Sequence, residues 1–98
     1  MYFAIMGEDA ADSLPLRLAV RPAHLQRLEQ LQAEGRLLLA GPFPVLQDGV
    51  LLPAMSGSLI VADFDSFEAC QVWANADPYM AAGVYAQVII KPFKKVFP

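Results

Sequence analysis

In SLIVADFDSFEACQVWANADP (residues 58–78), a strand, a turn and a helix follow one another directly. SLIVADF (58–64) is an apolar run of strand length. Asp65, with Glu68 three positions later, forms a capping-box pattern that predicts the start of a helix. Asp77 precedes a proline and so resists the α conformation, which predicts that the helix ends there. Apolar residues at helical spacing form the inner face of this helix: Phe67, Cys70 and Trp73.

Three further strands and one helix surround this unit. YFAIMG (2–7), LLLAG (37–41) and VYAQVIIK (84–91) are apolar runs of strand length. Between the first two, Pro22 suits the first turn of a helix because proline lacks an N–H donor, and Gly35 suits its end. The predicted element order is therefore βαββαβ.

Two segments are predicted to be loops. Residues 8–20 form a polar connection that is long for a small domain, and long loops are often functional. Residues 42–57 are rich in the residues that interrupt regular structure. These are Pro42, Pro44, Gly49, Pro53 and Gly57.

The element order and the length of 98 residues predict one domain, residues 1–98, of the α+β class. The simplest arrangement is a ferredoxin-like sandwich, in which a four-stranded antiparallel sheet carries both helices on one face. Right-handed crossovers insert one strand of each βαβ unit between the two strands of the other.

The strands are apolar toward both faces of the expected sheet. In residues 84–91, Val88 and Ile90 point to one face and Tyr85 and Ile89 to the other. Hydrophobic residues make up 56% of the chain. We therefore expect a homodimer or higher homo-oligomer that covers the open sheet face, although an ordinary apolar-rich surface is the simpler alternative.

Composition argues against several classes of function. The net charge of −3 disfavours nucleic-acid binding. No apolar run approaches the roughly 18 residues of a membrane span, and the N-terminus lacks signal-peptide features. A lone Cys70 fits a reducing, cytoplasmic compartment. One histidine and one cysteine do not predict a metal site, and no nucleotide- or cofactor-binding motif is present, so we expect no cofactor.

The expected topology brings the start of the first helix and the end of the second helix to one end of the fold. His24 and Asp77 lie at these two positions. A histidine oriented by a carboxylate is a candidate general base, and the positive end of a helix dipole would disfavour the imidazolium form. The alternative interpretations are a packing histidine and an aspartate that only terminates a helix.

Further polar residues are expected at the same end. Arg17 and Arg21 are candidates for holding an anionic small molecule through paired N–H donors, although Arg21 could merely be solvated at a helix start. Ser13 is a third candidate for positioning a substrate. Asp9 and Asp12 are placed there too and are rivals to Asp77 as the partner of His24.

Six stretches together resemble the YciI-like (YCII-related) family. They are ADSL (11–14), RPAHL (21–25), EGRLLLAGP (34–42), WANADPY (73–79), AAGVY (81–85) and KPFKKVF (91–97). The resemblance implies a ferredoxin-like fold of the dimeric α+β barrel type. It also implies a site centred on a histidine and an aspartate, which correspond to His24 and Asp77. Tyr79, two positions after Asp77, is a further candidate for binding a substrate.

Two functions follow as hypotheses. Some relatives in the resembled family are dehydrochlorinases, which suggests a small cofactor-free enzyme of the lyase, dehydrochlorinase or isomerase type. Its substrate would be a small polar or aromatic metabolite. The alternative is a non-catalytic module that binds a small ligand or a partner, because ferredoxin-like domains serve many functions.

Overall fold

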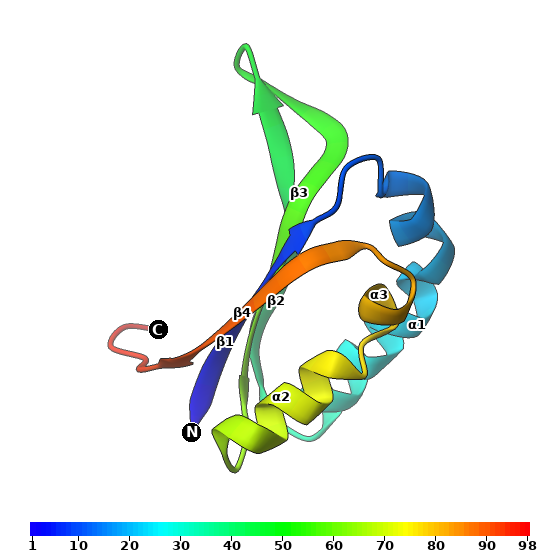
Figure 1. The fold of residues 1–98 in the computed structure, drawn as a ribbon. Coiled ribbons are helices and arrows are strands. Elements are labelled where there is room, and N and C mark those ends of the chain that lie inside the picture. The colour runs from blue at the N-terminus through cyan, green and yellow to red at the C-terminus, as the bar shows by residue number, and fades with distance from the viewer.

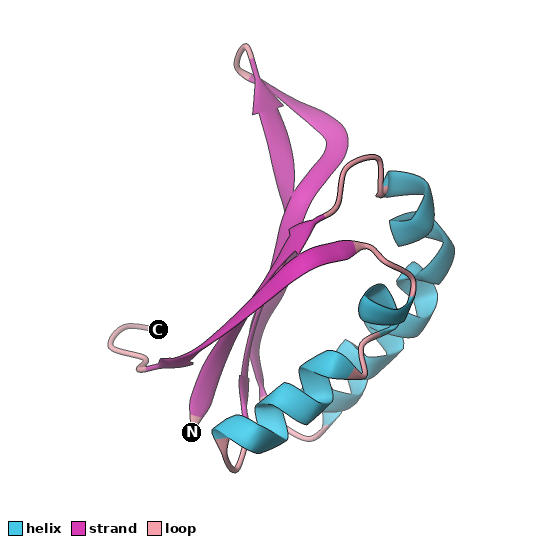
Figure 2. Cartoon of the chain, in the orientation of Figure 1, coloured by secondary structure: helices cyan, strands magenta, loops and turns pink.

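The computed structural model describes residues 1–98, and its four strands form one antiparallel sheet in the order β2-β3-β1-β4. All three helices lie on the same side of this sheet (Figures 1 and 2). The predicted α+β, ferredoxin-like fold is confirmed. The elements are β1 (Tyr2–Asp9), α1 (Leu14–Ala33), β2 (Leu37–Gln47), β3 (Val50–Asp63), α2 (Phe67–Asn75), α3 (Pro78–Ala81) and β4 (Tyr85–Phe93).

The core lies between the helices and one face of the sheet. Ile5 pairs with Ile60 on β3 and with Ile90 on β4, so three isoleucines form a row across the sheet. This row faces the helices, which contribute Leu31 and Cys70 to the same buried cluster. Burial of this apolar surface is the main driving force for the fold.

Helix α1 begins eight residues before Pro22, so the predicted helix start and the predicted loop over residues 8–20 are wrong. Ser13 is the N-cap of α1, and Pro15 lies in its first turn, where a missing N–H costs little. Pro22 lies inside the helix and is exposed. A proline does lie in the first turn of α1, as expected for a residue without an N–H donor, but it is Pro15 and not Pro22.

Residues 42–57 are not a loop, because β2 and β3 continue through them as a hairpin. Asp48 and Gly49 form its turn with φ values of 51° and 77°, as a two-residue hairpin turn of the primed type requires. The prolines are tolerated because Pro42 and Pro44 lie on β2, an edge strand. Pairing of β3 with β1 stops at Gly57, so residues 44–56 form a two-stranded hairpin arm that projects beyond the sheet (Figure 1).

The start of α2 also differs from the prediction. Its N-cap is Ser66 rather than Asp65, because the Ser66 hydroxyl accepts a hydrogen bond from the N–H of Ala69 at 3.1 Å. Cys70 of the predicted inner face is fully buried, Trp73 is half-buried, and Phe67 is exposed. No helix of the fold is long and apolar enough to cross a membrane.

Candidate active site

The inner face of α1 changes from polar to apolar along its length. Arg17, Arg21, His24, Leu28 and Leu31 follow one another at intervals of four and three residues, which places them on one side of the helix. The two leucines join the core. The three polar residues face the region between α1, α3 and the sheet, where the candidate site lies.

His24 and Asp77 form a buried pair at the centre of this region. Both carboxylate oxygens of Asp77 lie 2.9 Å from Nδ1 of His24, and the two residues are 5% and 3% exposed. Because a carboxylate only accepts hydrogen bonds, Nδ1 carries a proton, and in the neutral imidazole the lone pair is therefore on Nε2. Both hydrogen bonds of His24 are made at Nδ1, so Nε2 has no hydrogen-bond partner within the chain. Asp77, rather than Asp9 or Asp12, is therefore the carboxylate that contacts His24.

The position of His24 within α1 rules out an effect of the helix dipole on its imidazole, which the sequence had predicted. His24 was expected in the first turn, but the helix starts at Leu14, so His24 lies in its interior. The effect of the helix dipole falls off within the first turn and does not act on this imidazole. The environment of His24 is instead determined by Asp77 and Tyr79.

Tyr79 covers one face of the His24 ring. The two ring centroids are 3.9 Å apart and the planes are 7° from parallel. Asp77 positions both residues, because its Oδ1 accepts the backbone N–H of Tyr79 at 2.9 Å and caps α3. Burial raises the pKa of the Tyr79 phenol, while the positive charges of Arg17 and Arg21 act in the opposite direction. Tyr79 is thus a protonated phenol that can donate a hydrogen bond at neutral pH.

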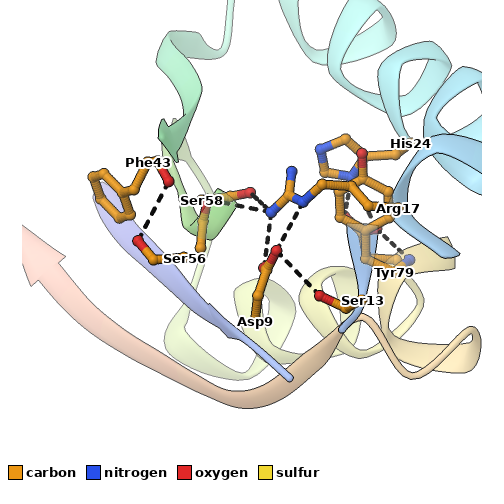
Figure 3. A network of polar contacts seen from close by, with 10 residues as sticks. Asp9, Ser13, Arg17, His24, Phe43, Ser56, Ser58 and Tyr79 are labelled. Atoms are coloured by element: carbon orange, nitrogen blue, oxygen red, sulfur yellow. Dashed lines mark hydrogen bonds and ion pairs between the residues drawn. The ribbon is translucent and has the colours of Figure 1, made fainter. Parts of the chain in front are cut away.

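Arg17 is anchored by a buried ion pair and keeps one nitrogen free. Its Nε and Nη2 donate to the two carboxylate oxygens of Asp9 at 2.9 and 2.8 Å. Nη2 also donates to the Ser58 hydroxyl at 2.8 Å and to the Gly57 carbonyl at 3.2 Å. Nη1 makes no hydrogen bond and carries no dashed line in Figure 3. Burial alone would lower the pKa of Arg17, but the hydrogen bond and charge of Asp9 raise it, so the guanidinium stays charged.

A β-bulge turns Tyr85 toward the site. The register of β4 against β1 shifts between Glu8 and Asp9, so Tyr85 pairs with Asp9 and lies over Gly7 on the helix side of the sheet. The prediction that Tyr85 shares the face of Ile89 is therefore wrong. Its ring contacts Tyr79 edge-on at 5.5 Å, and burial raises its pKa to about 12.

These groups surround a cavity of about 170 Å³. One wall is polar, and the unpartnered Nε2 of His24 and Nη1 of Arg17 belong to side chains of this wall (Figure 3). The opposite wall comes from β2 and β3. The lining residues that argue for a ligand are Arg17, Arg21, His24, Ser58 and Tyr79.

Four predicted site residues do not line this cavity, and one of them is Asp77, which contacts Nδ1 of His24. Asp9 and Ser13 lie behind Arg17, where the Ser13 hydroxyl donates to Asp9 at 3.5 Å. Asp12 is exposed in the turn before α1 with a φ of 56°. Asp9 and Ser13 thus hold Arg17 in place, and Asp12 contacts none of the central residues. No cluster of three or more His, Cys, Asp or Glu side chains is arranged to hold a metal ion.

Comparison with known proteins now gives the chain a family. Residues 1–94 match the YCII-related domain. The chain belongs to the YCII-related family. Protein YciI of Escherichia coli is 56% identical over 98 residues, which cover 99% of this chain and 100% of that protein. An uncharacterized protein of Haemophilus influenzae is 53% identical over 98 residues with the same coverage.

A solved structure with the same fold comes from a dehydrochlorinase. The 5-chloro-2-hydroxyhydroquinone dehydrochlorinase TftG of Burkholderia phenoliruptrix, in complex with 2,5-dihydroxybenzoquinone, superposes with a TM-score of 0.84 at 30% sequence identity. The alignment covers 96% of this chain and 94% of TftG. The resemblance to the YciI-like family, predicted from six short stretches, is confirmed over nearly the whole chain.

Two residues of this YCII-related site were missed in the sequence. Ser58 begins the apolar run 58–64 and has the same parity as Ile60 and Ala62, so it points to the helix side. A polar residue on the core-facing parity of a buried strand was the available signal. Tyr85 carried no such signal, because only the bulge between Glu8 and Asp9 brings it to this face.

Proposed function

We propose that this YCII-related domain is a small enzyme in which His24 is the general base and Asp77 orients it. The observation that carries this proposal is the buried His24–Asp77 pair. Its hydrogen bonds are made at Nδ1 of His24, so Nε2 is free beside a cavity. The reaction class that fits best is lyase, dehydrochlorinase or isomerase chemistry, in which one proton is removed from the substrate. Acid–base chemistry of this kind uses no cofactor.

In the proposed step, Nε2 of His24 takes a proton from an acidic O–H or C–H of the substrate. In an isomerisation the electron pair left behind shifts within the substrate, and the His24 imidazolium returns the proton to another atom. In an elimination that pair forms a new double bond, and the leaving group departs as an anion with the electrons of its own bond. Asp77 stabilises the imidazolium that forms, because its carboxylate lies 2.9 Å from Nδ1. Nη1 of Arg17 and the guanidinium of Arg21 would stabilise the negative charge on the substrate.

The cavity supports a substrate of one six-membered ring with oxygen substituents. Its volume of about 170 Å³ is close to the roughly 150 Å³ cavity that accepts benzene in another protein. The polar wall offers donors from Arg17, Arg21 and Tyr79 to hydroxyl, carbonyl or carboxylate groups. The similar enzyme TftG holds 2,5-dihydroxybenzoquinone, a molecule of this size and polarity.

The test compares binding with turnover in matched variants. 2,5-Dihydroxybenzoquinone binding is measured by calorimetry, and chloride release from chlorinated hydroxyhydroquinones is measured for the wild type, His24→Gln and the exposed control Gln32→Ala. We expect His24→Gln to retain binding within a few-fold and to lose about 10²–10⁴-fold in kcat, as loss of a general base does. Equal turnover by the wild type and His24→Gln would refute the assignment of the base.

A non-catalytic small-ligand module remains the second candidate, and one observation favours it. Asp77 caps α3 through the N–H of Tyr79, so its burial beside His24 has a purely structural use as well. This candidate predicts ring binding by the wild type, no turnover of any related substrate, and the same affinity in His24→Gln.

We also propose a homodimer that covers the open face of the sheet. Met6 pairs with Leu59 and with Ile89, so these three residues form an apolar row on the face away from the helices. Ile89 is 40% exposed in the single chain. A second copy of the same sheet would bury this row. The lone buried thiol of Cys70 is consistent with a cytoplasmic location, which we propose as well.

A further inference from the structure

Among side-chain polar atoms that are themselves closed off from solvent, one atom of Arg27 alone has no hydrogen-bond partner; Nε2 of His24 and Nη1 of Arg17 are not closed off in this way. The Arg27 atom is Nη1, and it lies 4.0 Å from Oδ2 of Asp77. Buried polar groups are almost always satisfied, so an unpaired one calls for a physical explanation. The adjacent carboxylate supplies it, because the guanidinium charge interacts with Asp77 without a direct hydrogen bond.

The guanidinium of Arg27 is held in this position from two sides. Its Cζ lies 4.2 Å from the centre of the Trp73 ring, in a cation–π arrangement. Its Nη2 donates to the backbone carbonyl of Trp73 at 2.8 Å. Arg27 also follows His24 by three residues on α1, so the two side chains are neighbours on the helix surface. The stack and the hydrogen bond to α2 therefore keep a fixed positive charge beside the His24–Asp77 pair.

We propose that Arg27 is a positioning residue that sets the charge balance of the His24–Asp77 pair. A positive charge beside Asp77 favours its ionised form and disfavours a second positive charge on the imidazole. Arg27 thereby disfavours the imidazolium form of His24 and favours release of the proton that His24 takes up in each turn of the reaction. This inference rests on the proposed function, because only a base needs that balance.

The other charged or titratable groups around the pair do not replace Arg27. From α1, Arg17 is neutralised by Asp9, and Arg21 is exposed to solvent. Tyr79 from α3 and Tyr85 from β4 contribute neutral phenols. The two strands that line the cavity, β2 and β3, add the uncharged Ser58 together with apolar residues and glycine. Arg27 is the guanidinium that forms an ion pair with Asp77.

The test is an NMR titration of the imidazole, which is unambiguous because His24 is the only histidine. A charge in direct contact shifts a titration by about 1–3 pH units. Arg27 acts through Asp77 and is partly exposed, so we expect Arg27→Gln to raise the midpoint by roughly 0.5–1 unit. Arg27→Lys, which keeps the charge, should restore most of the wild-type midpoint.

Arg36→Gln is the matched control. Arg36 also stacks on an aromatic ring, with its Cζ 5.1 Å from the centre of Phe64, but its ion pair is with Glu34. We expect the midpoint of the His24 titration in Arg36→Gln to equal that in the wild type. A shift in Arg27→Gln no larger than in Arg36→Gln would overturn the inference. If Arg27→Gln does not fold, Arg27→Met keeps the apolar stem on Trp73 and serves the same comparison.

This titration separates the inference from the proposed function. It reads the charge coupling directly and needs neither a substrate nor turnover. A raised midpoint in Arg27→Gln, combined with full turnover by His24→Gln, would support the charge coupling and refute the assignment of His24 as the base. An unchanged midpoint in Arg27→Gln, combined with the expected loss of turnover in His24→Gln, would support His24 as the base and refute the role of Arg27.

Discussion

At the scale of single residues, the ion pair between Asp9 and Arg17 stabilises the site without lining it. The side chains are 3% and 7% exposed, and the pair links the end of β1 to α1. Asp9→Asn would leave the buried Arg17 charge with neutral partners only, and losing one charged partner of a buried pair costs about 3–5 kcal/mol. We expect a loss in the free energy of unfolding of that size, measured by urea denaturation.

Asp12→Asn is the control for this change, because Asp12 lies three residues away and is exposed. Its effect should stay within about 0.5 kcal/mol, as is usual for surface substitutions. If the two variants were equally stable, the ion pair would contribute little, and Arg17 would have to be held by Ser58 and the Gly57 carbonyl alone.

The residue scale also shows which parts of the site were predictable. His24 and Asp77 were expected at one end of the fold, and they do contact each other, although His24 lies in the interior of α1 and not in its first turn. The chemistry ascribed to His24 from the helix dipole was wrong, since it depended on the exact start of α1. Arg17 was expected to bind a ligand with two paired donors, but Asp9 occupies Nε and Nη2, which leaves Nη1. Tyr85 was unpredictable, because one bulge reverses its face.

At the scale of elements, the hairpin arm depends on its turn. Gly49 has a φ of 77°, and a Cβ at this position would meet no atom within 4 Å, so any penalty for alanine comes from the backbone conformation alone. The left-handed region costs a residue with a Cβ about 1–2 kcal/mol. We expect Gly49→Ala to lower stability by that amount and to speed amide hydrogen exchange in residues 44–56. The control is Gly41→Ala on β2, which also has free space but no positive φ.

Gly41→Ala should change stability by no more than about 0.5 kcal/mol. Equal losses in the two glycine variants would mean that the conformation of the turn does not limit the arm. The same turn explains an error of prediction. Residues 42–57 were predicted as a loop from their prolines and glycines, whereas Asp48-Gly49 between two apolar runs is itself a strong hairpin signal. Proline argues against a strand only where that strand is hydrogen-bonded to a neighbour on both sides. β2 has a neighbouring strand on one side only, so its prolines are compatible with a strand.

At the scale of the whole molecule, the two faces of the sheet differ in what covers them. One face is covered by α1 and α2 and forms the buried core (Figure 2). The other face presents the row of Met6, Leu59 and Ile89. No helix of the chain lies on that side of the sheet (Figure 1). A sheet with water on one side normally alternates apolar and polar residues, and these strands do not. The second face is therefore the surface that we propose to pair with another copy.

This proposal predicts a mass of twice the 10.7 kDa chain mass in sedimentation and light-scattering measurements at micromolar concentration. If the two copies meet through this face, Ile89→Asp places two negative charges in the interface, one from each copy. Burying them unpaired should weaken association by on the order of 100-fold or more. Val72→Asp, on the exposed side of α2 at 70% exposure, adds the same charge away from this face and should leave the mass unchanged. A wild-type chain that stays monomeric, or an Ile89→Asp variant that dimerises as well as Val72→Asp, would place the interface elsewhere or remove it.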